Sequence, residues 1–157
     1  NFPAWRAASA VVMAELRGWS PVIALQIQYN LLKRAIEADY LPLADAYGLA
    51  VMAWSPLAGG RLARKNATAR TEPVIDALER IATEAETTPT GVALAWLKHN
   101  GVLPVIGARN LIQLAENLAA GALKLSEAQI EELGRLTDPA PSYPYDLLRG
   151  QRVKLGM

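Results

Sequence analysis

The sequence predicts an α/β protein built on a parallel sheet. Three short apolar runs alternate with stretches in which apolar residues recur at helical spacing, a pattern typical of a sheet with helices packed on it. No two of these runs are joined by a two-residue hairpin turn. Strands that are connected through a helix pair in parallel, because the crossover returns the chain to the same end of the sheet.

Two helix–strand cycles open the chain. Helices over residues 3–17 and 36–47 are each followed by a strand, over residues 22–27 and 49–54. Pro42 is expected to kink the second helix, because proline cannot donate a backbone hydrogen bond. The apolar face of the first helix is expected to consist of Trp5, Ala8, Val12 and Leu16.

The rest of the chain continues the alternation. The expected elements are a loop over residues 61–70, helices over 73–85, 89–100, 111–119 and 126–136, and a strand over 102–106. Ser126 and Gln129 match the capping box that satisfies free N–H groups at a helix start, and residues 139–157 form an irregular tail. Three strands are too few for a closed or doubly wound sheet, so something must complete it.

The composition excludes several classes of function. The formal net charge is +1, from 16 basic and 15 acidic residues spread along the chain, which excludes a nucleic-acid or membrane-surface footprint. The absence of cysteine excludes disulfides, thiolate catalysis and Cys-based zinc sites, and no metal site is expected. A cytoplasmic location is expected. A chain that begins at Asn1, without an initiator Met, is expected to be a piece of a longer polypeptide.

Functional residues are expected where the strands end. Ligands of parallel α/β folds bind at these points, which selects the loops over residues 26–31, 54–65 and 107–117. In the last of these, Gly107 allows close backbone approach, a helix start favours anions, and Arg109 offers a fork for phosphate. The spacing of the next polar residues suits a flat ring such as adenine, and these are Gln113, Glu116 and Asn117.

Each of these features also has a purely structural interpretation. Arg109 alone is typical of a surface cation, and Trp54 alone is more typical of a core residue than of a cofactor platform. Gly107 fits a strand end, and the pair Gly59 and Gly60 fits a simple turn. The acidic and basic residues at 79–80 and 127–132 are typical of solvated helix faces, and His99 of an exposed helix end.

Taken together, the motifs resemble those of the aldo-keto reductases. Residues 106–109 with 113–118 are similar to the last-strand motif of that family, and the resemblance continues in chain order over Asn1-Phe2 and residues 26–32, 54–60 and 92–97. The resemblance implies a (β/α)8 TIM barrel, of which residues 1–157 would be the C-terminal half. The missing N-terminal half, or self-association through open sheet edges, would complete the sheet.

The resemblance also implies an NADP site. Asn1 and Gln26 would bind the nicotinamide carboxamide and Trp54 would stack on the nicotinamide ring. Arg109 would bind the 2′-phosphate and favour NADP over NAD. The diphosphate would be lined by Ser55, Leu57, Gly59 and Lys65, next to Gly107, and the adenine by Gln113, Glu116 and Asn117.

The family's catalytic Asp, Tyr, Lys and His come from the first four strands, and no residue of this chain matches them. The resemblance therefore implies an oxidoreductase that passes hydride from NADPH to an aldehyde or ketone, present here as an inactive fragment. The alternative is a non-catalytic half barrel that binds a nucleotide and self-associates.

Overall fold

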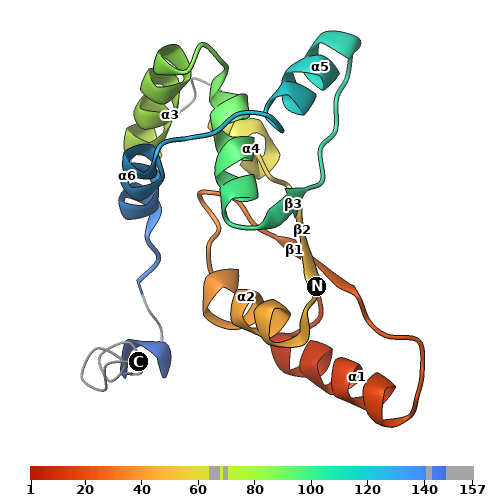
Figure 1. Cartoon of the computed structure of the whole chain (residues 1–157). Helices are drawn as coiled ribbons and strands as arrows, with labels where there is room; N and C mark the ends of the chain where they lie inside the picture. Colours follow the sequence, from red (N-terminus) through yellow and green to blue (C-terminus); the bar gives the residue numbers. More distant parts are fainter. Residues whose placement is uncertain (64–67, 69–70, 141–142, 148–157) are drawn as a thin grey trace.

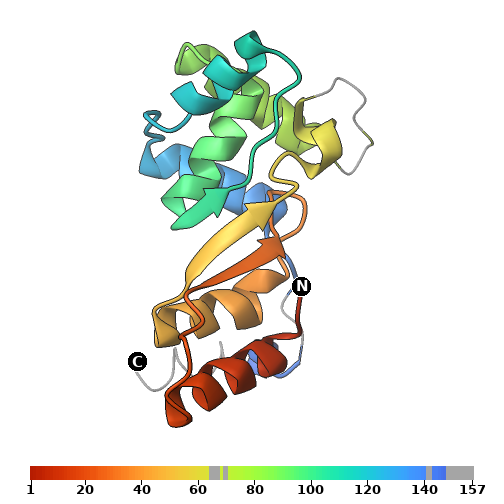
Figure 2. The same ribbon diagram turned by 90° about the vertical axis from the view of Figure 1, so that its right-hand side faces the viewer.

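The computed structural model describes residues 1–63, 68, 71–140 and 143–147. Its centre is a three-stranded parallel sheet of β1 (Ala24–Gln28), β2 (Ala50–Trp54) and β3 (Val102–Pro104), in the order β1-β2-β3. In Figure 2, α1 and α2 (red and orange) lie toward the bottom of the view, and α3, α4 and α5 (green to cyan) lie toward the top. The predicted α/β class with parallel strands is confirmed.

The strands are in register across the sheet. Gln26 of β1 pairs with Met52 of β2, and Met52 pairs with Leu103 of β3. The third strand ends at Pro104, two residues earlier than predicted. One more bond still forms beyond it, from the Val105 N–H to the Ala53 carbonyl at 2.8 Å.

The helices follow the predicted order (Figure 1). They are α1 (Ala4–Leu16), α2 (Ile36–Tyr47), α3 (Glu72–Glu84), α4 (Pro89–His99), α5 (Leu111–Ala119) and α6 (Glu127–Thr137). The capping box of Ser126 and Gln129 is present at the start of α6. The predicted loop after β2 differs, because it opens with a short 3-10 helix, η1 (Ala58–Ala63). Within the described residues, no helix is long and apolar enough to span a membrane.

The core lies on one face of the sheet, against α4. Val51, Ala53 and Val102 are buried on this face. Helix α4 is buried on every side from Gly91 to Leu97, rather than only along the predicted side that contains Trp96. A helix that is apolar all round is expected at the centre of a core, and here α4 packs against α3, α5, η1 and β3.

In the described part of the chain, the opposite face of the sheet (the bare face) carries exposed side chains. Side chains alternate along a strand, so Gln26, Met52 and Leu103, which are paired across the sheet, point to the face opposite the core. Gln26 is exposed, and Leu103 is 58% exposed although it is apolar. In a closed barrel this face would point inward.

Two helices also present apolar side chains to solvent. In α1 the predicted apolar face is exposed, with Leu16 81% exposed, and the helix is instead buried at Ala7 and Ala14. In α5 the side chain of Leu111 is 83% exposed. Helical spacing shows which residues share a face, but not whether another element covers that face.

A largely buried ion pair connects the segment after β1 to the end of α6. The Arg34 side chain forms two hydrogen bonds with the Glu37 carboxylate, at 2.6 and 2.9 Å. The same guanidinium donates to the Gly134 carbonyl at 2.7 Å and to the Thr137 hydroxyl at 2.9 Å. It also lies 5.3 Å from the centre of the Trp96 ring. The Arg34 side chain therefore contacts α2, α4 and α6 at once.

The Tyr29 hydroxyl belongs to the same cluster and donates to Glu37 at 2.7 Å. Burial of the phenol, followed by its hydrogen bond to the Glu37 carboxylate, raises the pKa of Tyr29 above the ordinary tyrosine value. A group whose pKa is raised on folding contributes stability that is complete below the unfolded-state pKa of about 10 and is lost as the pH rises further.

We therefore expect Tyr29→Phe to change the alkaline limb of the stability curve. The variant loses about 1 kcal/mol at neutral pH, because one hydrogen bond is removed, but its free energy of unfolding falls less steeply above about pH 10 than that of the wild type. Urea unfolding at a series of pH values measures both effects. Parallel curves for the two proteins would contradict this assignment of Tyr29.

Candidate functional site

The loops that follow β2 and β3 meet around one hollow. Its volume is about 230 Å³, and it is open to solvent. The residues that line it after β2 are Ser55, Pro56, Leu57, Gly59 and Gly60, and those from the second loop and α5 are Val105, Ile106, Gly107 and Asn117. Residues about fifty positions apart in the sequence are thus brought together at the carboxyl ends of neighbouring parallel strands.

The loop after β2 is a tight double turn. The Ser55 carbonyl accepts the Ala58 N–H at 3.0 Å, and the Leu57 carbonyl accepts the Gly60 N–H at 2.9 Å. Gly59 and Gly60 have φ angles of 68° and 85°, which glycine adopts without strain. Among the described residues, neither the Leu57 N–H nor the Gly59 N–H has an acceptor. The turn therefore offers backbone donors of the kind that bind anionic oxygens.

The loop after β3 is fixed by a reciprocal cap at the start of α5. Asn110 is the N-cap residue, and its side chain accepts the Gln113 N–H at 2.9 Å. The Gln113 side-chain oxygen in turn accepts the Arg109 N–H at 3.0 Å. The backbone of Arg109 is held in place while its side chain is exposed. Sequence reasoning missed Asn110, although an Asn followed three residues later by Gln is a capping signal.

The polar residues on α5 lie in different surroundings. Asn117 is 9% exposed, lines the hollow, and donates its side-chain amide to the Gly107 carbonyl at 3.4 Å. Gln113 and Glu116 are exposed. The predicted common face therefore runs from the floor of the hollow to the surface beside Arg109.

The residues expected at the nicotinamide, Asn1, Gln26 and Trp54, do not line this hollow. The Trp54 ring N–H donates to the Asn1 side-chain oxygen at 2.9 Å, and Trp54 directly precedes Ser55. Asn1 and Gln26 line a second and larger hollow of about 630 Å³, which is mostly apolar and lies between α1 and β1. Lys65 lies outside the described residues.

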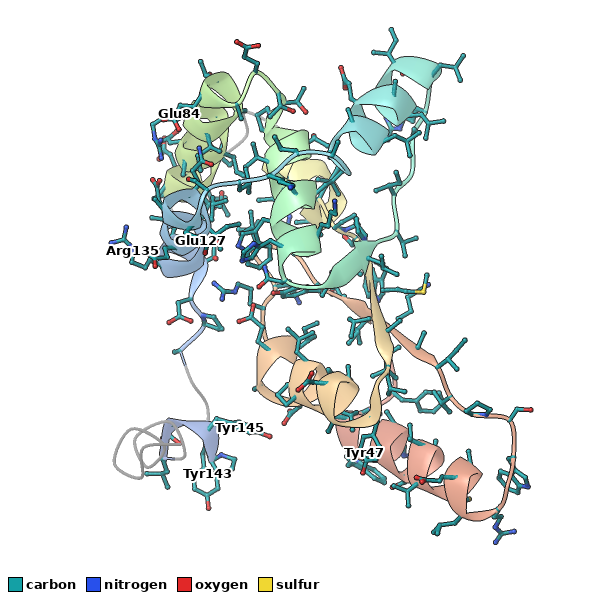
Figure 3. The ribbon with its side chains drawn as sticks, viewed as in Figure 1. Tyr47, Glu84, Glu127, Arg135, Tyr143 and Tyr145 are labelled. Carbon is teal, nitrogen blue, oxygen red and sulfur yellow. The ribbon has the colours of Figure 1, made fainter. Side chains whose placement is uncertain are left out.

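The charged helix faces on α3 and α6 are separate from the strand ends. Figure 3 shows Glu84 on α3, with Glu127 and Arg135 on α6. Arg80 pairs with Glu84 and with Glu132 of α6, and the hydrogen bond from Arg80 lowers the pKa of Glu84. Exposed ion pairs of this kind contribute little to stability. The interpretation of these charges as solvated helix faces is confirmed.

Comparison with known proteins identifies the family. The model of the "Aldo/keto reductase family" matches residues 1–138. The chain is 36% identical to "Uncharacterized oxidoreductase YrpG" of Bacillus subtilis, over 90% of this chain and 47% of that protein. It is 31% identical to "Aldo-keto reductase ausK" of Emericella nidulans, over 94% of this chain and 42% of that protein. It is 30% identical to "Putative aryl-alcohol dehydrogenase AAD14" of Saccharomyces cerevisiae, over 93% of this chain and 45% of that protein.

The chain spans about half the length of the curated relatives it matches. Its three-stranded parallel sheet with flanking helices is consistent with part of the (β/α)8 barrel that the family implies. The family match agrees with the resemblance found in the sequence motifs, and it extends over most of the chain. The chain belongs to the aldo-keto reductase family of oxidoreductases.

Proposed function

We propose that this protein acts as an NADP-dependent reductase of aldehydes or ketones, and that the described loops form its cofactor site. The observation that carries the proposal is the hollow at the ends of β2 and β3. It combines a turn with available backbone N–H groups and a capped helix start beside Arg109. Both are features that bind phosphate groups.

The diphosphate of the cofactor is assigned to the turn after β2. The N–H groups of Leu57 and Gly59 have no acceptor among the described residues, and Ser55 adds a hydroxyl beside them. A glycine at position 59 allows the ligand to approach the backbone, because a Cβ is absent there. Lys65 is proposed to add charge on family resemblance alone.

The adenosine end is assigned to the loop after β3 and the start of α5. The Arg109 guanidinium is exposed on a fixed backbone, so it is available to a 2′-phosphate, which NADP carries and NAD lacks. The side-chain oxygen of Gln113 and the amide nitrogen of Asn117 already form hydrogen bonds. Adenine would therefore meet the Gln113 amide nitrogen, the Asn117 oxygen and the Glu116 carboxylate.

The nicotinamide end is assigned to Trp54, Asn1 and Gln26. The Trp54 ring donates its N–H to Asn1 from the ring edge, so this bond leaves the ring faces available for stacking. Gln26 is exposed on the bare face of the sheet, and its amide can donate and accept, as a carboxamide ligand requires. The order nicotinamide, diphosphate, adenosine then follows the strand order β1-β2-β3.

In this proposal the bound NADPH supplies the hydride, and the residues of this chain bind and orient it. The proton that the carbonyl oxygen takes up would come from an acid outside this chain, since no residue here matches the family's catalytic Tyr. We therefore expect the purified 157-residue chain to bind NADPH without reducing carbonyl compounds. Calorimetric titration measures binding, and loss of NADPH absorbance with an aromatic aldehyde measures turnover. Turnover typical of an ordinary reductase would contradict the claim that the proton donor lies outside this chain.

A second candidate is a non-catalytic half barrel that self-associates. It is favoured by the exposed apolar residues on the bare sheet face and on α5, of which Leu103 and Leu111 are examples, and by β1 and β3 being sheet edges. Sedimentation of the 157-residue chain distinguishes the candidates. A stable dimer favours the self-associating half barrel, and a monomer favours the reductase.

A further inference from the structure

Asn30 is a fully buried polar residue that lies two positions beyond the end of β1. Its backbone forms a bridge with Lys33, in which each residue accepts the N–H of the other. Its side-chain oxygen accepts the Leu32 N–H at 3.0 Å. Its side-chain amide crosses to the neighbouring strand and donates to the Ser55 carbonyl at 2.9 Å. Asn30 thus connects a rigid segment after β1 to the first residue after β2.

The partner of Asn30 has an unusual backbone conformation. Ser55 has a φ angle of 53° and Ala58 one of 52°, in the left-handed region that residues other than glycine rarely adopt. Such conformations persist only where the surroundings hold them. At Ser55 the carbonyl receives two donors, the Ala58 N–H within the turn and the Asn30 amide from outside it.

We infer that Asn30 is a positioning residue for the cofactor turn, because its amide holds the Ser55 carbonyl and so keeps residues 55–60 in a shape ready for the diphosphate. This inference rests on the proposed function, since it assumes that the turn binds a diphosphate. Asn30 itself lines neither hollow. Its effect on the ligand is exerted through the Ser55 backbone, which leads directly into the residues with available N–H groups.

The chemistry of the position requires an amide. The side chain must accept from Leu32 and donate to Ser55 at the same time, and an asparagine amide does both from one short side chain. An aspartate keeps the acceptor but loses the donor. An alanine loses both, which removes the acceptor of the Leu32 N–H and leaves the Ser55 carbonyl with the Ala58 N–H alone.

The test compares two ligands that differ in whether they need the turn. NADPH contains the diphosphate, whereas adenosine 2′-monophosphate contains only the adenosine and the 2′-phosphate that are assigned to the loop after β3. We expect Asn30→Asp and Asn30→Ala to weaken NADPH binding about tenfold, the effect of one lost hydrogen bond to a buried carbonyl. Binding of adenosine 2′-monophosphate should stay unchanged.

A matched control is Asn100→Asp. Asn100 also donates its amide to a main-chain carbonyl, that of Trp96 at 2.8 Å, but it lies at the end of α4, before β3 begins. This variant has the same added charge and a similar lost bond, and it should bind both ligands as the wild type does. The uncharged Asn30→Ala separates the lost bond from the added charge at position 30. Equal weakening of both ligands by the Asn30 variants, or of neither, would overturn the inference.

Nuclear magnetic resonance separates this inference from the proposed function. If the wild type binds neither ligand, the cofactor proposal fails, and the amide signals of Gly59 and Gly60 then decide the positioning role without a ligand. The Gly59 and Gly60 signals should shift in Asn30→Ala and stay in place in Asn100→Asp. Unshifted signals in both variants would overturn the positioning role of Asn30. If the Asn30 variants do not fold, the wild type is measured instead. Scalar coupling across the hydrogen bond from the Asn30 amide to the Ser55 carbonyl would show that this bond forms in solution. Its absence would refute the inference.

Discussion

Replacing Arg34 with alanine is expected to lower the free energy of unfolding by about 3 kcal/mol. The side chains of Arg34 and Glu37 are only 12% and 19% exposed, so the substitution leaves a largely buried carboxylate without its cation. Removing one partner of a buried pair typically costs about 3–5 kcal/mol. The lower end applies here, because Glu37 keeps its bond from the Tyr29 hydroxyl. The midpoint and slope of urea unfolding measure the loss.

A matched control is available on the surface. Arg80 also pairs with two partners, Glu84 and Glu132, but its side chain is 47% exposed. Arg80→Ala is therefore expected to shift the urea midpoint only slightly, because exposed ion pairs are screened by water and salt. Similar losses for Arg34→Ala and Arg80→Ala would show that burial of the Arg34 cluster is not what stabilises the junction of α2, α4 and α6.

Replacing Arg109 with alanine is expected to weaken NADPH binding about 10- to 100-fold and to leave NADH binding nearly unchanged. Hydrogen bonds to charged groups contribute about 1.5–3 kcal/mol, and each 1.4 kcal/mol corresponds to a factor of ten in affinity. Only NADPH carries the 2′-phosphate that the guanidinium is proposed to bind, so the loss should be selective. Calorimetric titration of both cofactors gives the ratio directly.

The control for this prediction is Arg135→Ala. Arg135 is an exposed cation on α6, and its removal changes the net charge by the same amount as removal of Arg109. It should affect both cofactors weakly and equally. If Arg109→Ala reduced NADH and NADPH binding by the same factor, the 2′-phosphate assignment would be wrong and only a general electrostatic role would remain.

Local sequence signals were sufficient for the elements that depend on neighbouring residues. The bounds of α5 follow from its helical spacing, and the start of α6 from the Ser126 capping box. The end of β2 at Trp54 followed from its apolar run, and the end of β3 lies within two residues of the predicted one. Since these ends carry the candidate site, its location could be predicted as well.

Features that depend on distant residues could not be predicted. The exposed face of α1 has the same spacing as a buried one, and its exposure depends on which elements are present beside it. The contacts of Arg34 with Gly134 and of Asn30 with Ser55 join residues 100 and 25 positions apart. No local pattern identifies such pairs. The left-handed φ of Ser55 was missed for the same reason, because it is held from the neighbouring strand.

The most direct test of the whole account is a titration of the isotopically labelled chain with NADPH, followed by nuclear magnetic resonance. We predict that the Trp54 ring N–H, the Gly59 amide and the Arg109 side chain shift together with one dissociation constant, because a single dinucleotide contacts all three groups. Shifts confined to one of these groups, or shifts with separate dissociation constants, would contradict a shared cofactor site.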